Sequence, residues 1–133
     1  MLQIRSLEHL VLTVADVEST CAFYTRVLGI REVVFGGGRH ALVFGDQKIN
    51  LHQHEAEFEP KALRPTPGSA DFCLLTETPF KEVVRHLSDC GVPVLEGPVE
   101  RTGATGPITS VYLRDPDSNL IELANRKTRV DAG

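Results

Sequence analysis

Five polar side chains lie within otherwise apolar runs of this chain. They are His9 in LEHLVLTV, Asn50 and His52 in INLHQ, Asp71 in SADFCLL, and Glu122 in NLIEL. A buried charge is costly unless it is paired or binds a metal. Imidazole and carboxylate groups together suit a first-row divalent cation. The sequence therefore suggests a divalent metal site with His9, His52, Asp71 and Glu122 as candidate ligands.

The elements that must position these residues follow from hydrophobic patterning. Residues Leu7–Val14 are rich in branched side chains and indicate a buried strand. Asp16 can cap a following helix, and Gly29 is a typical helix end. Glycine-rich turns then separate three predicted strands: Ile30–Phe35, Ala41–Phe44 and Lys48–His52.

After a charged, proline-containing connector at residues 54–68, the same order of elements returns. Thr78-Pro79 predicts the start of a second helix that Gly91 ends, with Phe80, Val84 and Leu87 on its buried face. The predicted strands are Ser69–Thr76, Val92–Leu95, Thr109–Leu113 and Leu120–Ala124, with a loop at Gly97–Pro107. The tail after Arg126 is expected to fray.

The spacing of the predicted elements indicates that the chain contains an internal repeat, in which the order of elements recurs. His9 to Gly29 and Asp71 to Gly91 both span 20 residues, and the second segment lies 62 positions after the first. The INL that contains Asn50 aligns with the IEL that contains Glu122 at an offset of 72. We therefore predict an α+β fold of two βαβββ modules in a single domain of residues 1–133. Module one covers about 5–53 and module two about 69–126, and His9 and Asp71 are counterparts, as are Asn50 and Glu122.

Composition excludes several classes of function. The 133 residues carry a formal net charge of -4 with scattered basic residues, so no nucleic-acid partner is expected. There is no apolar run long enough for a membrane-spanning helix, and the N-terminus lacks the features of a signal peptide. Three cysteines (Cys21, Cys73 and Cys90), an odd number without CxxC spacing, are typical of a reduced cytoplasmic protein.

Two motifs resemble a known family. LEHLVLTVADVESTCAFYTRVLGI at the start and YLRDPDSNLIEL at the end resemble the vicinal oxygen chelate superfamily, the glyoxalase, bleomycin-resistance and extradiol-dioxygenase group. The middle of the chain is most similar to the subgroup called glyoxalase domain-containing protein 5 and to bacterial lactoylglutathione lyase-like virulence proteins. The resemblance implies a half-open barrel around a divalent metal (Zn, Ni, Mn or Fe), and a homodimer.

The resemblance also implies roles for individual residues. His9 corresponds to the first-strand ligand and Glu122 to the last-strand ligand, with Glu122 as the proton-transfer group. Asp71 stands where many members have His, and Asn50 stands where glyoxalases have Glu. Asn50 is a weak ligand and cannot act as a base, so His52 is an alternative third ligand.

Ordinary structural roles compete with these assignments. Glu122 could lie on a solvated strand face, His9 could be a core histidine, Asp71 could belong to a turn, and His52 could end a strand. For a substrate pocket, the candidates are Asn50, Cys73, Arg101 and Tyr112. Cys73 would also fit as a small buried hydrophobe, and Arg101 as a solvated loop residue.

Two classes of function follow. The first is a metal-dependent lyase or isomerase of the glyoxalase type that acts on a small substrate through vicinal oxygens, with an extradiol-type dioxygenase as the variant if iron binds. The second is a metal-free protein of the bleomycin-resistance type that sequesters a drug or metabolite. The departures from the family's ligands at Asn50 and Asp71 favour the second class. The presence of both His9 and Glu122, the first- and last-strand ligands that the resemblance implies, favours the first.

Overall fold

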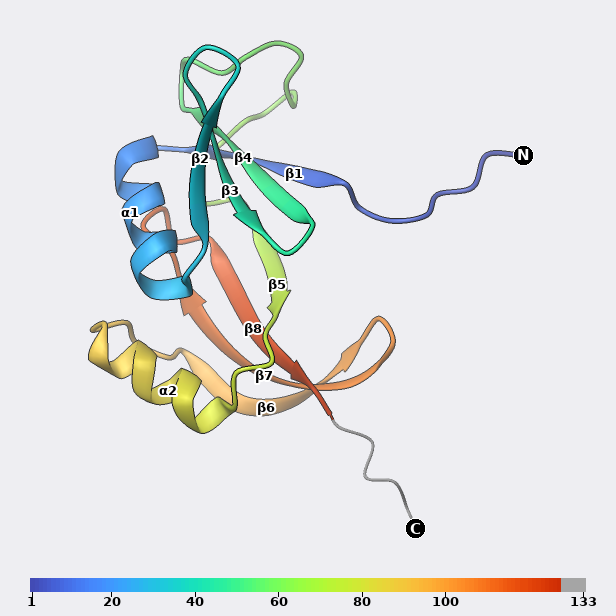
Figure 1. Cartoon of the computed structure of the whole chain (residues 1–133), viewed down its shortest axis with the longest axis vertical. Helices are drawn as coiled ribbons and strands as arrows, with labels where there is room; N and C mark the ends of the chain where they lie inside the picture. Colours follow the sequence, from blue (N-terminus) through green and yellow to red (C-terminus); the bar gives the residue numbers. More distant parts are fainter. Residues whose placement is uncertain (128–133) are drawn as a thin grey trace. The chain divides into compact units, whose positions relative to one another are not determined.

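The structure is a computed structural model that describes residues 1–127 (Figure 1). The chain divides into two compact units, of which the first is Met1–Ser69 and the second begins at Ala70. The same element order recurs in each unit: strand, helix and three further strands. The predicted α+β fold of two βαβββ modules is therefore confirmed.

The first unit contains one helix and one four-stranded sheet. Its elements are β1 (His9–Val14), α1 (Val17–Leu28), β2 (Arg31–Phe35), β3 (Arg39–Phe44) and β4 (Gln47–Gln53). The strand order is β1-β4-β3-β2, with β1 parallel to β4 and the other pairs antiparallel. The first and last strands of the unit therefore lie side by side, and they are the strands that carry His9, Asn50 and His52.

Local signals set the bounds of α1. The Asp16 side chain accepts a hydrogen bond from the backbone N–H of Ser19 at 3.1 Å, as an N-cap should. Gly29 ends the helix in the left-handed conformation, with φ at +65°. The side-chain amide of Gln53, at the end of β4, donates to Ala15 O and accepts from Val17 N. These contacts tie the start of α1 to the parallel strand pair.

Side-chain alternation gives the sheet of the first unit two unlike faces. Buried apolar residues lie on the face that α1 covers: Leu12, Val14, Leu42, Ile49 and Leu51. The register places His9, Val11 and Thr13 of β1 on the other face, beside Asn50 and His52 of β4. That second face, called here the open face, carries the candidate site residues of this unit.

The second unit repeats this plan with a longer hairpin. Its elements are β5 (Asp71–Leu75), α2 (Phe80–Asp89), β6 (Glu96–Gly103), β7 (Gly106–Arg114) and β8 (Leu120–Arg126). The strand order is β5-β8-β7-β6, and β5 and β8 are parallel. Apolar side chains of β7 and β8 form the centre of its core: Val111, Leu113, Ile121 and Leu123.

Two sequence predictions in this unit are wrong. Val92–Leu95 is not a strand, and Gly97–Pro107 is not a loop, because β6 begins at Glu96 and pairs with β7 through Gly103↔Gly106. The segment EGPVERTG looks irregular because it contains glycine, proline and charge. Hydrogen bonding to β7 stabilises this segment as a strand, and such long-range pairing cannot be predicted from the local sequence pattern.

The second helix also differs from the prediction in detail. Pro79, not Thr78, occupies the N-cap position, without a side-chain capping bond, so the helix begins at Phe80. The buried helical residues are Val83 and Leu87, whereas Val84 is 36% exposed. Gly91 follows the last turn with φ at +71°, which agrees with its predicted role as the helix end.

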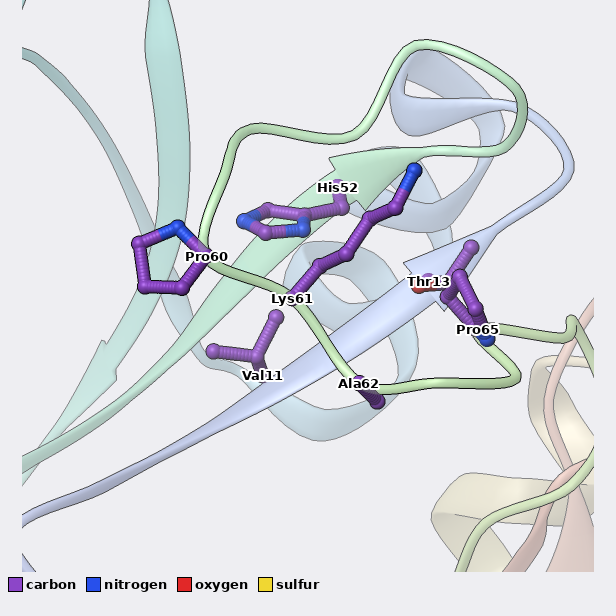
Figure 2. Close-up of a pocket in the computed structure, with 7 residues that line it drawn as sticks. All are labelled: Val11, Thr13, His52, Pro60, Lys61, Ala62 and Pro65. Carbon is purple, nitrogen blue, oxygen red and sulfur yellow. The ribbon is translucent and has the colours of Figure 1, made fainter.

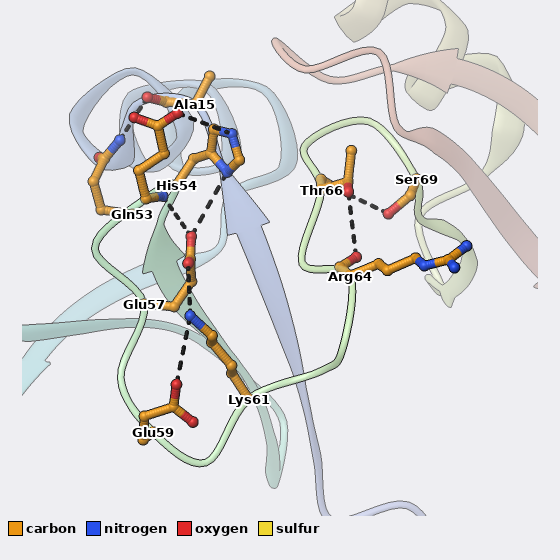
Figure 3. A network of polar contacts seen from close by, with 10 residues as sticks. Ala15, Gln53, His54, Glu57, Glu59, Lys61, Arg64, Thr66 and Ser69 are labelled. Carbon is orange, nitrogen blue, oxygen red and sulfur yellow. Dashed lines mark hydrogen bonds and ion pairs between the residues drawn. The ribbon is translucent and has the colours of Figure 1, made fainter.

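The connector at residues 54–68 has no helix or strand but is organised by its own contacts (Figure 3). Glu57 accepts a hydrogen bond from Glu55 N and forms ion pairs with His54 and Lys61. Within residues 1–127, neither helix is long and apolar enough to cross a membrane. The predicted frayed tail falls largely on residues 128–133, outside the described part.

Candidate metal and substrate site

The strand registers confirm the counterparts that the spacing predicts. In the first unit His9 pairs with Lys48 and Asn50 lies two residues further along β4. In the second unit Asp71 pairs with Leu120 and Glu122 lies two residues further along β8. His9 with Asn50, and Asp71 with Glu122, are therefore equivalent diagonal pairs, each with an offset of roughly 7 Å along the strands.

His52 does not share this relation. It pairs with Thr13, four residues beyond His9, which is roughly 13 Å along the parallel strands. His52 instead lines a cavity of about 280 Å³ on the open face, together with Thr13 and Lys61 (Figure 2). The two imidazoles of the first unit therefore do not lie side by side.

The surroundings of His52 favour its neutral form. Burial lowers the pKa of the imidazole, and the positive charge of Arg39 lowers it further. The Phe58 ring packs edge-on against His52 at 5.6 Å between centroids, and the Arg39 guanidinium lies 4.1 Å from the centroid of the same ring. A neutral imidazole can accept a hydrogen bond or bind a metal.

The connector forms one wall of the His52 cavity, which the sequence did not suggest. Pro60, Lys61, Ala62 and Pro65 line it opposite β1 and β4 (Figure 2). The Lys61 ammonium lies 3.5 Å from a carboxylate oxygen of Glu57. Burial opposes the ionisation of Glu57, but hydrogen bonds from the backbone and the charge of Lys61 outweigh it, so the pKa of Glu57 is lowered. The closely spaced prolines around Lys61 were the available sequence signal for a fixed wall.

His9 and Asn50 both present groups that a bound ion or ligand could use. His9 Nδ1 is 2.8 Å from Glu8 Oε1, and since a carboxylate only accepts, Nδ1 is the donor, which in a neutral imidazole leaves the lone pair on Nε2. The Asn50 side-chain oxygen is buried and has no hydrogen-bond partner among residues 1–127. Leaving a buried acceptor unsatisfied costs about 1–3 kcal/mol, so a bound cation or hydrogen-bond donor at this oxygen would be stabilising.

Glu122 is half-buried and held by two donors. Ser110 Oγ donates to Glu122 Oε2 at 2.5 Å. Cys73 lies directly opposite Glu122 across the β5–β8 pair. Burial raises the pKa of the Cys73 thiol to about 11, with help from the charge and hydrogen bonding of Glu122. The thiol is therefore protonated near neutral pH, so it donates to the carboxylate and is not a nucleophile.

A cavity of about 420 Å³ lies in front of Glu122, within the second unit. Cys73, Arg101 and Tyr112 contribute to its lining, together with Arg126 and the turn between β6 and β7. Arg101 lies in β6, not in a loop; its Nε donates to Tyr112 Oη at 3.0 Å and its Nη2 donates to Glu96 at 3.0 Å. The predicted pocket residues Cys73, Arg101 and Tyr112 are thus brought together with Glu122.

Asp71 is exposed at the first position of β5, diagonal to Glu122. It does not line the cavity in front of Glu122. Ser110 is the residue of this site that sequence reasoning did not connect with Glu122, although its alternation with Tyr112 on β7 was visible. The arrangement offers a fixed carboxylate, a cationic side chain and a phenol around one cavity, which suits a small anionic or oxygen-rich ligand.

Residues 6–123 match the model of the Glyoxalase/Bleomycin resistance protein/Dioxygenase superfamily. The chain belongs to this superfamily. The resemblance stated from the terminal motifs is thereby confirmed, together with the fold class it implied.

Similar proteins lie close in sequence. The chain is 60% identical to the Virulence protein STM3117 of Salmonella typhimurium over 89% of this chain and 82% of that protein. It is 57% identical to the Glyoxalase domain-containing protein RDO1 of Mycosarcoma maydis, over 93% of this chain and 70% of that protein. A crystal structure of the Salmonella virulence protein superposes with a TM-score of 0.93 at 57% identity, over 95% of this chain and all of that chain. None of these names specifies a reaction.

Proposed function

We propose that the chain is a divalent-metal-dependent enzyme of the glyoxalase type, a lyase or isomerase. Its small substrate would offer two neighbouring oxygens. The observation that carries this proposal is the Glu122 carboxylate, which Ser110 and Cys73 hold at the edge of a cavity of about 420 Å³. A fixed carboxylate beside a substrate-sized cavity is the arrangement that proton transfer requires.

The donor set fits a divalent ion. In its neutral form His9 has a lone pair on Nε2, and the hydrogen bond to Glu8 orients the ring, as carboxylates do for many metal-binding histidines. Glu122 and Asp71 are the diagonal pair of the second unit. One imidazole and two carboxylates suit manganese, iron, nickel or zinc. We therefore propose His9, Asp71 and Glu122 as ligands.

His52 is an alternative ligand in the sequence, but the register supports a different role. Its position with Thr13 and Lys61 around the smaller cavity is suited to substrate binding. Asn50, whose side-chain oxygen lacks a partner, is suited to accept a hydrogen bond from substrate or to bind the ion as a neutral ligand. Neither residue is needed as a base, because Glu122 supplies that group.

The bound ion would supply Lewis-acid polarisation of the two substrate oxygens. Glu122 would take a proton from the carbon beside the polarised carbonyl and return it to the neighbouring carbon. Ser110 would keep the carboxylate oriented, and Arg101 with Tyr112 would bind a negatively charged part of the substrate. We also predict a homodimer and a cytoplasmic location, on the resemblance and on the cysteine content respectively.

The test is the metal content of protein purified without a histidine tag or chelator. We expect His9→Ala and Glu122→Ala each to lose about one equivalent of transition metal relative to wild type. His86→Ala on α2 is the matched control and should keep the wild-type content. Unchanged metal content in His9→Ala and Glu122→Ala would refute the ligand assignment. A wild type that, after loading with manganese, iron, nickel and zinc, holds no more metal than His9→Ala and Glu122→Ala would refute the enzyme proposal.

A second function is favoured by one observation. Asn50 is neutral where glyoxalases carry a glutamate, so the first unit lacks the carboxylate that would strengthen metal binding. A protein that binds a drug or metabolite without metal would tolerate this change. Retention of a small ligand by metal-free protein, with affinity lost in Arg101→Ala, would support this function over the enzyme. If iron is the bound metal, the reaction to assay is an extradiol-type dioxygenation.

A further inference from the structure

The covered face of the first unit carries a second group of metal-ligating side chains. Cys21 of α1, Glu32 of β2 and His40 of β3 each offer one ligand atom, and these three atoms lie within 4.8 Å of one another. The register places Glu32 opposite Leu42, and His40 opposite Leu51, so both point to the face under α1. This group is on the opposite side of the sheet from His9, Asn50 and His52.

Without a metal ion, hydrogen bonds to Glu32 connect the three side chains. His40 Nδ1 lies 2.9 Å from Glu32 Oε2. The Cys21 thiol also hydrogen-bonds to Glu32, which lowers the pKa of the carboxyl, while burial and then this contact raise the pKa of the thiol to about 12. Glu32 therefore accepts from both neighbours. A metal ion could take the place of the shared protons without a rearrangement of the backbone.

The three ligands differ in exposure in a way that suits a three-ligand site. Cys21 is 4% exposed, whereas the side chains of His40 and Glu32 are 35% and 39% exposed. They line a broad hollow of about 720 Å³ along α1. Asp16, Glu18 and Arg26 also line it, so carboxylates outnumber cationic side chains around the opening. The local field therefore attracts a cation, and the outward position remains open to water.

We propose that Cys21, Glu32 and His40 bind a zinc-like divalent ion, with one coordination position left to water or a small ligand. Thiolate in the ligand set favours zinc and cobalt over magnesium or calcium. Two protons must move as the ion binds: the thiol gives up its proton to solvent as the sulfur–metal bond forms, and the proton of the neutral His40 imidazole moves, through solvent, from Nδ1 to Nε2 so that Nδ1 can bind the ion. Thiolate, carboxylate and neutral imidazole then offset the two positive charges, so the site is electrically neutral.

The consequence for the fold is a metal link between α1 and the β2–β3 hairpin. The three ligands come from three elements, and a bound ion would hold them more firmly than the present hydrogen bonds. The Cys21, Glu32 and His40 site does not depend on the proposed function, because it shares no ligand with the set His9, Asp71 and Glu122.

The experiment is a cobalt titration of the full chain after removal of metals with chelator. Thiolate bound to cobalt gives an intense charge-transfer absorption in the near ultraviolet, which carboxylate and imidazole ligands do not give. Wild type should show this absorption with an intensity that corresponds to one thiolate-bound ion per chain, because the ligands proposed for the other site include no thiolate. Cys21→Ser should lose it, and Cys73→Ser, which removes a thiol from the other unit, should keep it.

Two further variants keep the proposal testable if Cys21→Ser folds poorly. Glu32→Gln and His40→Gln alter partly exposed ligands and should each weaken cobalt binding tenfold or more while the circular dichroism spectrum stays that of wild type. His9→Ala and Glu122→Ala should leave the charge-transfer absorption unchanged, so failure of the proposed function is distinguishable from failure of this proposal. Wild type without the absorption, or the absorption lost in Cys73→Ser, would overturn the proposal.

Discussion

The turn that precedes Glu122 is expected to be a large contributor to the stability of the second unit. Asp115 is 6% exposed and Asn119 is 1% exposed. The Asp115 carboxylate accepts three hydrogen bonds, each at 2.9 Å: from Asp117 N, from Asn119 N and from Asn119 Nδ2. Asn119 Oδ1 in turn accepts from Ala70 N at 2.9 Å, just before β5. The turn thus links β7, β8 and the start of β5.

The magnitude follows from these contacts. A hydrogen bond to a charged group contributes about 1.5–3 kcal/mol, and losses within one network are not additive. We therefore expect Asp115→Ala to lower the free energy of unfolding by roughly 3–4 kcal/mol. Asp115→Asn keeps one oxygen for the two backbone N–H groups but sets an amide donor against Asn119 Nδ2. It should cost roughly half as much.

The assay is urea denaturation followed by circular dichroism, with Asp46→Ala, an exposed residue in the turn between β3 and β4, as the control. The double variant of Asp115→Ala with Asn119→Ala should cost less than the sum of the single variants by about 1 kcal/mol or more, because the two side chains share one network. A cost of less than about 1 kcal/mol for Asp115→Ala, or an Asp115→Asn variant as unstable as Asp115→Ala, would show that these hydrogen bonds do not stabilise the turn.

Three further outcomes are expected. The Cys21 thiol has its pKa raised from 9.0 to about 12, so the folded state keeps a proton that the unfolded chain releases above pH 9. The unfolding free energy of metal-free protein should therefore fall by about 1.4 kcal/mol per pH unit above that pH, relative to Cys21→Ala measured in parallel. Gly97→Ala would bring a Cβ within 2.4 Å of Ser110 O, at a φ of +110°, and should lower the midpoint of urea denaturation by far more than Gly106→Ala, which meets nothing within 4 Å. Ser110→Ala removes the donor to Glu122 and should weaken divalent-ion binding by this carboxylate about three- to tenfold, roughly 1 kcal/mol, in a chelator competition.

The repeat could be predicted from the sequence because the signals that define it are local. Strand alternation, the Asp16 cap and the Gly29 end all act over a few residues. The offsets of 62 and 72 correctly align His9 with Asp71 and Asn50 with Glu122, since both pairs have the same register in the structure. Position along the chain and side-chain alternation together fixed which residues share a face.

Long-range pairing explains what the sequence did not reveal. The apolar run Val92–Leu95 looked like a strand, yet β6 begins at Glu96, where β7 supplies hydrogen-bond partners. The grouping of Cys21, Glu32 and His40 depends on the β2–β3 register and on the packing of α1. No spacing rule connects these three residues, so composition and motifs do not single out His40 as a candidate ligand.

The two diagonal pairs occupy equivalent positions but differ in chemistry. His9 and Asn50 supply neutral nitrogen and oxygen donors, whereas Asp71 and Glu122 supply two carboxylates. Only the second pair carries the negative charge that would offset a divalent ion. Each pair by itself is a weak cation site, because the first lacks charge and the second lacks a nitrogen donor. Glu122→Gln should therefore weaken divalent-ion binding, because it removes one of the two carboxylates of the second pair. Asn50→Asp should strengthen it, because it adds a carboxylate to the pair that lacks charge.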